Sequence, residues 1–96
     1  MTIDVEKTKA EAFRLEGLGE FRAALAKYQQ IVDADKENVE ALFRQGEMHH
    51  QLGELPEALS AYIRVTDLDE EHKKANVKVQ MILSILNYYN KDMINP

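Results

Sequence analysis

The apolar positions of this chain recur at the spacing of one helix face over most of its length. After Asn38, apolar and small side chains recur every three or four residues as far as Gly53, where a helix can end in the left-handed conformation. Pro56 suits the first turn of a second helix, and the apolar rhythm resumes behind it. The stretch before Asn38 follows the same plan around Gly19. The pattern therefore predicts two pairs of helices within residues 5–72.

The two predicted pairs are copies of one 34-residue unit. When residues 5–38 are laid over residues 39–72, 11 of the 34 positions are identical, where average composition would give roughly two. The identical positions include Gly19 with Gly53, Ala24 with Ala58, and Tyr28 with Tyr62. Small residues let two helices approach closely, and a tyrosine one turn later fills the wider space beside them. The identities therefore mark a structural repeat.

The shared residues resemble those of the tetratricopeptide repeat family. The resemblance is clearest in Leu18-Gly19-Glu20-Phe21 with Ala24 and Tyr28, and in Leu52-Gly53-Glu54 with Ala58 and Tyr62. It implies an all-α fold, in which antiparallel helix pairs stack into an α-solenoid with a right-handed superhelical turn. Thr8, Lys36 and Glu70 stand where the family usually has a large apolar residue and two prolines. Because neighbouring repeats supply packing in such arrays, we expect the fold to tolerate these departures.

We therefore expect a single domain over residues 1–96 with five helices. Repeat 1 spans residues 5–38 and repeat 2 spans residues 39–72. A final helix over residues 73–89 continues the stack as a capping helix, and residues 90–96 form a tail.

The final helix carries more apolar surface than a cap requires. Two apolar stripes cover roughly two thirds of its circumference, whereas a surface helix usually has one stripe a little over 100° wide. We assign the first stripe to contact with repeat 2; it comprises Ala75, Val79, Ile82, Leu83 and Leu86. The second comprises Val77, Met81, Ile85 and Tyr88. It covers the end of the stack, binds a partner, pairs with a second copy or receives the tail.

The resemblance implies that the first helix of each repeat lines a concave groove. The groove residues that we expect to contact a partner are Lys9, Phe13, Phe43, Arg44, Glu47, Lys74, Val77, Lys78, Met81 and Ile85. Phe13 and Phe43 matter most, because each is large and apolar yet falls off the stripe that packs within its own repeat.

One branch of the family holds a chaperone's C-terminal tail in a carboxylate clamp of lysines, an arginine and two asparagines. Lys9, Lys74 and Lys78 match clamp positions, the last as a lysine in place of arginine, but Phe13 and Arg44 replace the two asparagines. The sequence therefore predicts no chaperone-tail binding, although a groove with these cations still suits a different peptide that carries a carboxylate.

Composition narrows the function further. The chain has 12 Lys and Arg against 17 Asp and Glu, a formal charge of -5, which argues against nucleic-acid binding. It has no cysteine, so disulfides, zinc–thiolate sites and thiol catalysis are excluded. The apolar runs are too short to span a bilayer, and the first residues do not read as a secretory signal. We expect a cytoplasmic protein without membrane contact.

The residues that could support chemistry are sparse. His49 and His50 are adjacent, so their side chains point about 100° apart on a helix and cannot share a metal ion. The glycines around Leu18 follow no strand and do not form a phosphate loop. We expect no catalytic residue, no metal site and no cofactor.

These observations predict a non-catalytic interaction module that binds a peptide or protein segment in its concave groove. Two alternatives stay open: a homodimer formed through the apolar final helix, and a small assembly or secretion chaperone with a dedicated client. An enzyme is the hypothesis that the sequence supports least.

Overall fold

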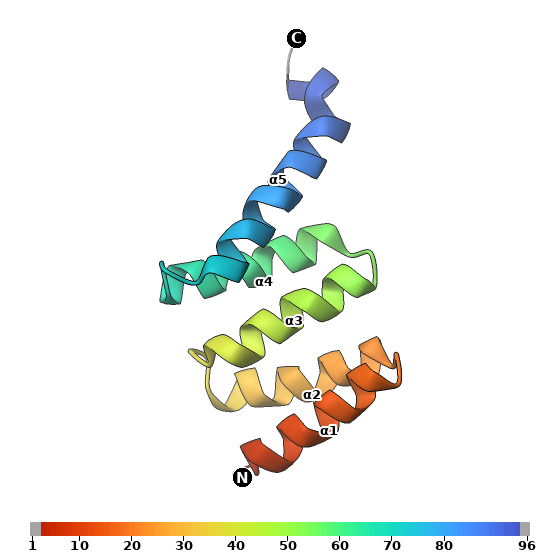
Figure 1. Cartoon of the computed structure of the whole chain (residues 1–96), viewed down its shortest axis with the longest axis vertical. Helices are drawn as coiled ribbons and strands as arrows, with labels where there is room; N and C mark the ends of the chain where they lie inside the picture. Colours follow the sequence, from red (N-terminus) through yellow and green to blue (C-terminus); the bar gives the residue numbers. More distant parts are fainter. Residues whose placement is uncertain (1–2, 95–96) are drawn as a thin grey trace.

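The computed structural model describes the backbone of residues 3–94 and the side chains of residues 3–88, and that part of the chain contains five α-helices and no strand. The helices are α1 (Val5–Gly17), α2 (Phe21–Ala34), α3 (Val39–Gln51), α4 (Leu55–Leu68) and α5 (Lys73–Ile94). Each helix packs mainly against the next one along the chain (Figure 1). The result is an elongated stack with the termini at opposite ends. The predicted all-α helical-repeat solenoid is confirmed.

Capping residues show that the 34-residue period continues into α5. The side chain of Asp4 accepts a hydrogen bond from the backbone N–H three residues later (3.1 Å), and Asn38 does the same (3.0 Å). Thirty-four residues further on, Nδ1 of His72 accepts a hydrogen bond from the N–H of Ala75 (3.1 Å). A side chain that satisfies a free N–H group fixes where a helix starts. The start of α5 is therefore that of a third unit, although its sequence no longer matches the first two.

Within each helix pair the chain reverses at a glycine. Gly19 and Gly53 have φ values of 77° and 76°, in the left-handed region that other residues adopt only at a cost. This conformation ends α1 and α3 and brings α2 and α4 back alongside them, as the sequence predicts.

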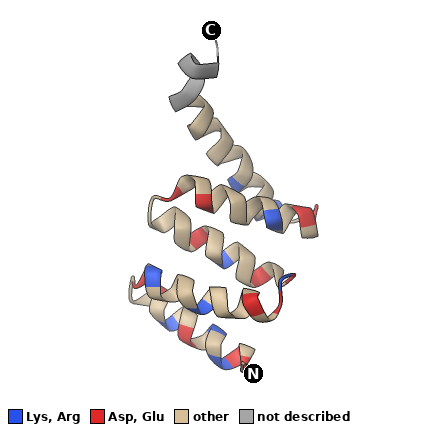
Figure 2. Ribbon diagram, turned by 180° about the vertical axis from the view of Figure 1, so that it is seen from behind, with Lys and Arg blue, Asp and Glu red and all other residues tan. Residues whose placement is uncertain are grey.

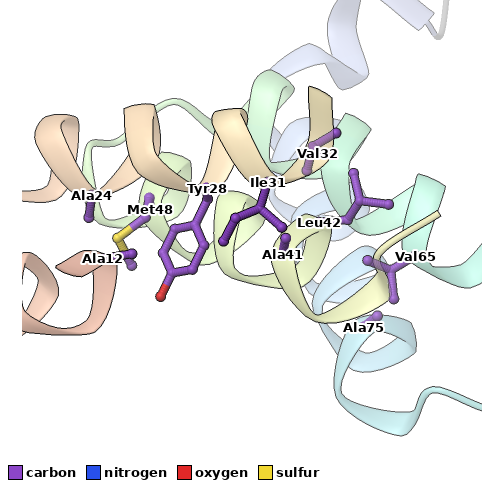
Figure 3. Packing of buried hydrophobic residues seen from close by; sticks show 10 residues of the cluster. All are labelled: Ala12, Ala24, Tyr28, Ile31, Val32, Ala41, Leu42, Met48, Val65 and Ala75. Atoms are coloured by element: carbon purple, nitrogen blue, oxygen red, sulfur yellow. The ribbon is translucent and has the colours of Figure 1, made fainter. Parts of the chain in front are cut away.

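The core runs along the stack and includes buried residues from all five helices (Figure 3). Ala12 and Ala24 have no exposed surface, and their small side chains let α1 and α2 approach closely. Ala75 is also fully buried in this cluster, so the core holds the start of α5. The cluster comprises Ala12, Ala24, Tyr28, Ile31, Val32, Ala41, Leu42, Met48, Val65 and Ala75.

The contact between α4 and α5 is narrower than predicted. Ile82 is fully buried with Ala58 and Tyr62, and Val79 and Leu86 pack against them. Leu83, by contrast, is 43% exposed, so its assignment to the contact with repeat 2 is wrong. It follows Ile82 by 100° around the helix, which places it beyond the edge of the contact.

Helix α5 is also longer than predicted. It continues to Ile94, whereas we expect a helix end at residue 89 and a tail over residues 90–96. The expectation is wrong for residues 90–94 because no glycine or proline interrupts the helix before Pro96. The last turns of α5 extend past the rest of the stack (Figure 1). The suggested return of the tail onto the domain involves side chains outside the described residues.

Gly46 leaves room for the ring of Tyr62. A Cβ atom at residue 46 would lie 2.6 Å from a Tyr62 ring carbon, and Tyr62 has no exposed surface through which to move away. Alanine gains about 1 kcal/mol over glycine inside a helix, but overpacking a core costs about 1–3 kcal/mol. We expect Gly46→Ala to lower the urea midpoint, with a net loss of up to about 2 kcal/mol.

Gly17→Ala is the matched control for this prediction. Gly17 is also in a helix, and nothing lies within 4 Å of a Cβ atom placed there. Gly17→Ala should therefore leave stability unchanged or raise it. Equal urea midpoints for the wild type and Gly46→Ala would contradict the close contact between α3 and Tyr62.

Candidate functional site

A groove with a volume of about 400 Å³ lies between α3 and α5. Phe43, Arg44 and Glu47 line it from α3, and Lys73, Lys74, Val77 and Lys78 line it from α5. Six of the predicted site residues therefore share one groove. Lys73 also lines the groove, although it is not among the predicted site residues. The sequence pattern places it on the polar stripe of the final helix. We refer to these seven residues as the α3–α5 groove.

Phe43 forms part of the groove wall while being held by the core. Its ring centroid lies 5.6 Å from that of Tyr62 and 5.0 Å from that of His72. It is partly buried, so the expectation that it stands clear of the packing within its repeat is wrong. The missing side chain at Gly46, one turn later, allows Tyr62 to approach α3 closely enough for this contact. The packing fixes the orientation of the Phe43 ring.

The polar side of the groove is built from two related sets of contacts. Glu16 accepts a hydrogen bond from the hydroxyl of Tyr28 and also pairs with Arg44 of the next repeat. In the following unit, the hydroxyl of Tyr62 donates to Glu47 Oε1 (3.0 Å), and Lys78 Nζ lies 3.9 Å from the same oxygen.

The repeat places the tyrosines and the cations, because Tyr28 and Tyr62 are 34 residues apart and so are Arg44 and Lys78, whereas the two glutamates are not equivalent positions of the unit. Burial, together with the adjacent carboxylate, raises the pKa of the Tyr28 and Tyr62 hydroxyls. Both hydroxyls therefore remain protonated donors at physiological pH. Each carboxylate links the tyrosine of one unit to a cation of the next.

The α5 wall of the groove is cationic and partly apolar. Lys73 and Lys74 are exposed and form no ion pair with any described side chain, and Lys78 has only the distant contact with Glu47. These lysines belong to the first turns of α5, where Figure 2 shows blue ribbon. Val77 lies among them and is 65% exposed. An apolar side chain ringed by positive charge is thus open to solvent.

The other four predicted residues do not line this groove. Lys9 pairs with Glu40 across the repeats (2.8 Å) and lines a separate hollow of about 230 Å³ between α1 and α3. Phe13 is 46% exposed and contacts the edge of Tyr28. Met81 packs towards the core beside α4, and Ile85 is partly buried further along α5. The predicted concave surface is therefore split between two hollows, one beside α1 and α3 and the other between α3 and α5.

Glu54 ties the two repeats together in the turn before α4. Its two carboxylate oxygens accept hydrogen bonds from Arg22 (2.8 and 3.2 Å), and His49 Nδ1 lies 2.9 Å from Oε1. These contacts account for His49 in the described structure without a metal ion. In the described residues, no three His, Asp or Glu side chains are grouped as a metal site would require.

Comparison with known proteins identifies the repeat. A family model described as tetratricopeptide repeat matches residues 10–71, about two thirds of the chain. The match confirms the resemblance that the 34-residue unit carries. A search of curated proteins found no match. None of the helices in the described part has the length and hydropathy needed to cross a bilayer.

The contacts of Glu54 predict a pH dependence of stability. Hydrogen bonds from Arg22 and His49 lower the pKa of Glu54 below its ordinary value of 4.5. A carboxyl group with a lowered pKa in the folded state contributes stability above its unfolded pKa and loses it as the pH falls through the folded pKa. Glu54→Gln should therefore reduce the loss of unfolding free energy between roughly pH 5 and pH 3.

Urea unfolding at a series of pH values measures this effect. Glu20→Gln is the matched control, because Glu20 occupies the same position in repeat 1 and has no ion pair with a described residue. The control should retain the acid sensitivity of the wild type. The same acid profile for Glu54→Gln and the wild type would contradict the role assigned to these contacts.

Proposed function

This chain belongs to the tetratricopeptide repeat family, whose members generally mediate protein–protein interaction, and we propose that it is a non-catalytic module that binds a segment of a partner protein in the α3–α5 groove. Phe43 and Val77 supply the apolar contact, and the lysines of α5 orient the segment.

The observation that carries this proposal is the exposure of Val77 opposite the immobilised ring of Phe43. An exposed apolar surface with a polar rim is typical of an interaction site, and a volume of about 400 Å³ suits a few side chains of a bound segment. Because core contacts hold Phe43 while Val77 faces solvent, a partner side chain can bury both without displacing the fold.

The groove walls are largely preformed, which supports binding of a flexible segment. Phe43 is packed between two rings, Arg44 is paired with Glu16, and Glu47 accepts a hydrogen bond from Tyr62. Ordering side chains on binding costs about 0.5–1.5 kcal/mol for each flexible one. A groove whose α3 wall is already ordered avoids much of that cost.

The same contacts favour binding over catalysis. Among the described residues that line the groove, the one carboxylate is that of Glu47, which accepts a hydrogen bond from the buried hydroxyl of Tyr62 and faces Lys78. A general acid or base needs an unengaged proton-transfer group within reach of a substrate. The polar groups of α3 instead connect one unit of the stack to the next.

A homodimer through α5 is the second candidate function. It is favoured by the exposure of Leu83 and by the turns of α5 that extend past α4 (Figure 1). A small assembly or secretion chaperone would use the groove in the same way, with a client segment as the ligand. Mass measured against concentration in solution separates a dimer from both forms of groove binding.

Capture of a partner by variants of this chain tests the groove. Val77→Glu puts a carboxylate at the proposed contact, and burying it against an apolar side chain should weaken binding at least about tenfold. Ile63→Glu is the control, because Ile63 is an exposed apolar residue of α4 outside the groove. Circular dichroism should show both variants folded.

The expected result is a protein captured by the wild type and by Ile63→Glu but lost with Val77→Glu. Equal capture by all three baits would contradict binding in the groove. A chain whose mass doubles with concentration, with Leu83→Glu restoring the monomer and no other protein captured, would support the homodimer instead.

A further inference from the structure

The charge of the groove breaks the pattern of the repeat. Residues 6, 40 and 74 are equivalent by the 34-residue period, and they are Glu6, Glu40 and Lys74. Lys73 and Lys74 stand in the first turn of α5, whereas α1 and α3 carry a glutamate in that turn. Positive charge near a helix N-terminus opposes the helix dipole and disfavours the helix. The stability of the fold therefore does not account for these two lysines.

The positive charge of the groove is only partly neutralised by the protein itself. Four cations and one carboxylate line the groove, although the whole chain carries a formal charge of -5. Glu16 neutralises Arg44, and Glu47 lies 3.9 Å from Lys78. Lys73 and Lys74 have no ion pair among the described side chains. The charge that is left for a ligand is concentrated at these two lysines, beside the exposed Val77.

We infer that the partner segment is an acidic internal stretch of a protein chain, with one apolar side chain flanked by Asp or Glu residues. This inference rests on the proposed function and adds the chemistry of the ligand to it. The apolar side chain packs on Val77 and Phe43, and the flanking carboxylates face Lys73, Lys74 and Lys78.

The donors in the groove favour side-chain carboxylates within a segment over a free chain end. Among its lining residues the groove has no asparagine or glutamine, and its one guanidinium is already paired with Glu16. Fixed recognition of a carboxylate usually depends on forked or amide donors, whereas lysines act as mobile point charges. Mobile lysines suit several carboxylates spread along a segment.

Fluorescence anisotropy with four labelled peptides tests the inference. The probe is an acetylated and amidated peptide with a leucine between two pairs of glutamates. The comparison peptides have glutamine in place of glutamate, alanine in place of leucine, or a free C-terminal carboxylate. We expect the first peptide to bind at least about tenfold more tightly than the glutamine and alanine peptides, because each loses one of the two kinds of contact. Added salt should weaken its binding, and the free carboxylate should add less than about twofold.

Two charge-reversal variants show whether the lysines of α5 are responsible. Lys74→Glu restores the glutamate found at this position in the other two units. It should weaken binding of the acidic peptide at least about tenfold while leaving Tm unchanged or higher. Lys7→Glu, near the start of α1 and outside the groove, makes the same change in net charge and should leave binding within about twofold.

The outcomes separate the ligand chemistry from the proposed function. Equal binding of the glutamate and glutamine peptides, or binding only with a free carboxylate, would overturn the inference that the ligand is an acidic internal segment. A lysate partner that is still lost with Val77→Glu would then leave groove binding intact. If Lys74→Glu and Lys7→Glu weakened binding of the acidic peptide equally, the inference would also be overturned, because the effect would then come from net charge alone.

Discussion

The buried tyrosine of each unit is the constraint on which the rest of the structure depends. The rings of Tyr28 and Tyr62 are almost completely buried, so they fill the space between helices, and each hydroxyl must have a hydrogen-bond acceptor. The acceptors are Glu16 and Glu47, and each carboxylate also faces a cation of the next unit. One residue type thus fixes both the packing within a pair and the polar contact between units. The second set of contacts, from Tyr62 through Glu47 to Lys78 of α5, contributes Glu47 and Lys78 to the α3–α5 groove.

Much of the fold follows from residues that act locally. The glycines at residues 19 and 53 and the caps at Asp4 and Asn38 set the helix ends, and identical spacing makes two equal units. The end of α5 could not be predicted in this way, because residues 90–94 contain no signal that stops a helix. Its start is set by His72, which is an unusual cap and is recognisable only through its position in the period.

The sequence predicts which helices line the candidate site, but it does not predict which side chains the groove includes. Family geometry indicates which helices face the groove, and this was enough to bring six of the ten predicted residues together. The packing of Phe43 depends on the absence of a side chain at Gly46, which sequence periodicity records only as a small residue. Lys9 and Glu40, which are 31 residues apart, pair across the repeats in a hollow separate from the groove. The packing of Phe43 and the pairing of Lys9 with Glu40 depend on distances between helices, which the sequence pattern does not specify.

In the proposed function, helix stability and ligand binding favour opposite charges at the start of α5. A glutamate at residue 74 would suit the helix dipole, as it does at residue 40, yet the chain has a lysine there. A titration of the isotope-labelled chain with the acidic leucine peptide, followed in amide NMR spectra, tests binding in the α3–α5 groove most directly. We predict saturable shifts confined to the amides around Phe43 and residues 73–78. Saturable shifts confined to the exposed faces of α2 and α4, or no shifts at millimolar peptide, would contradict it.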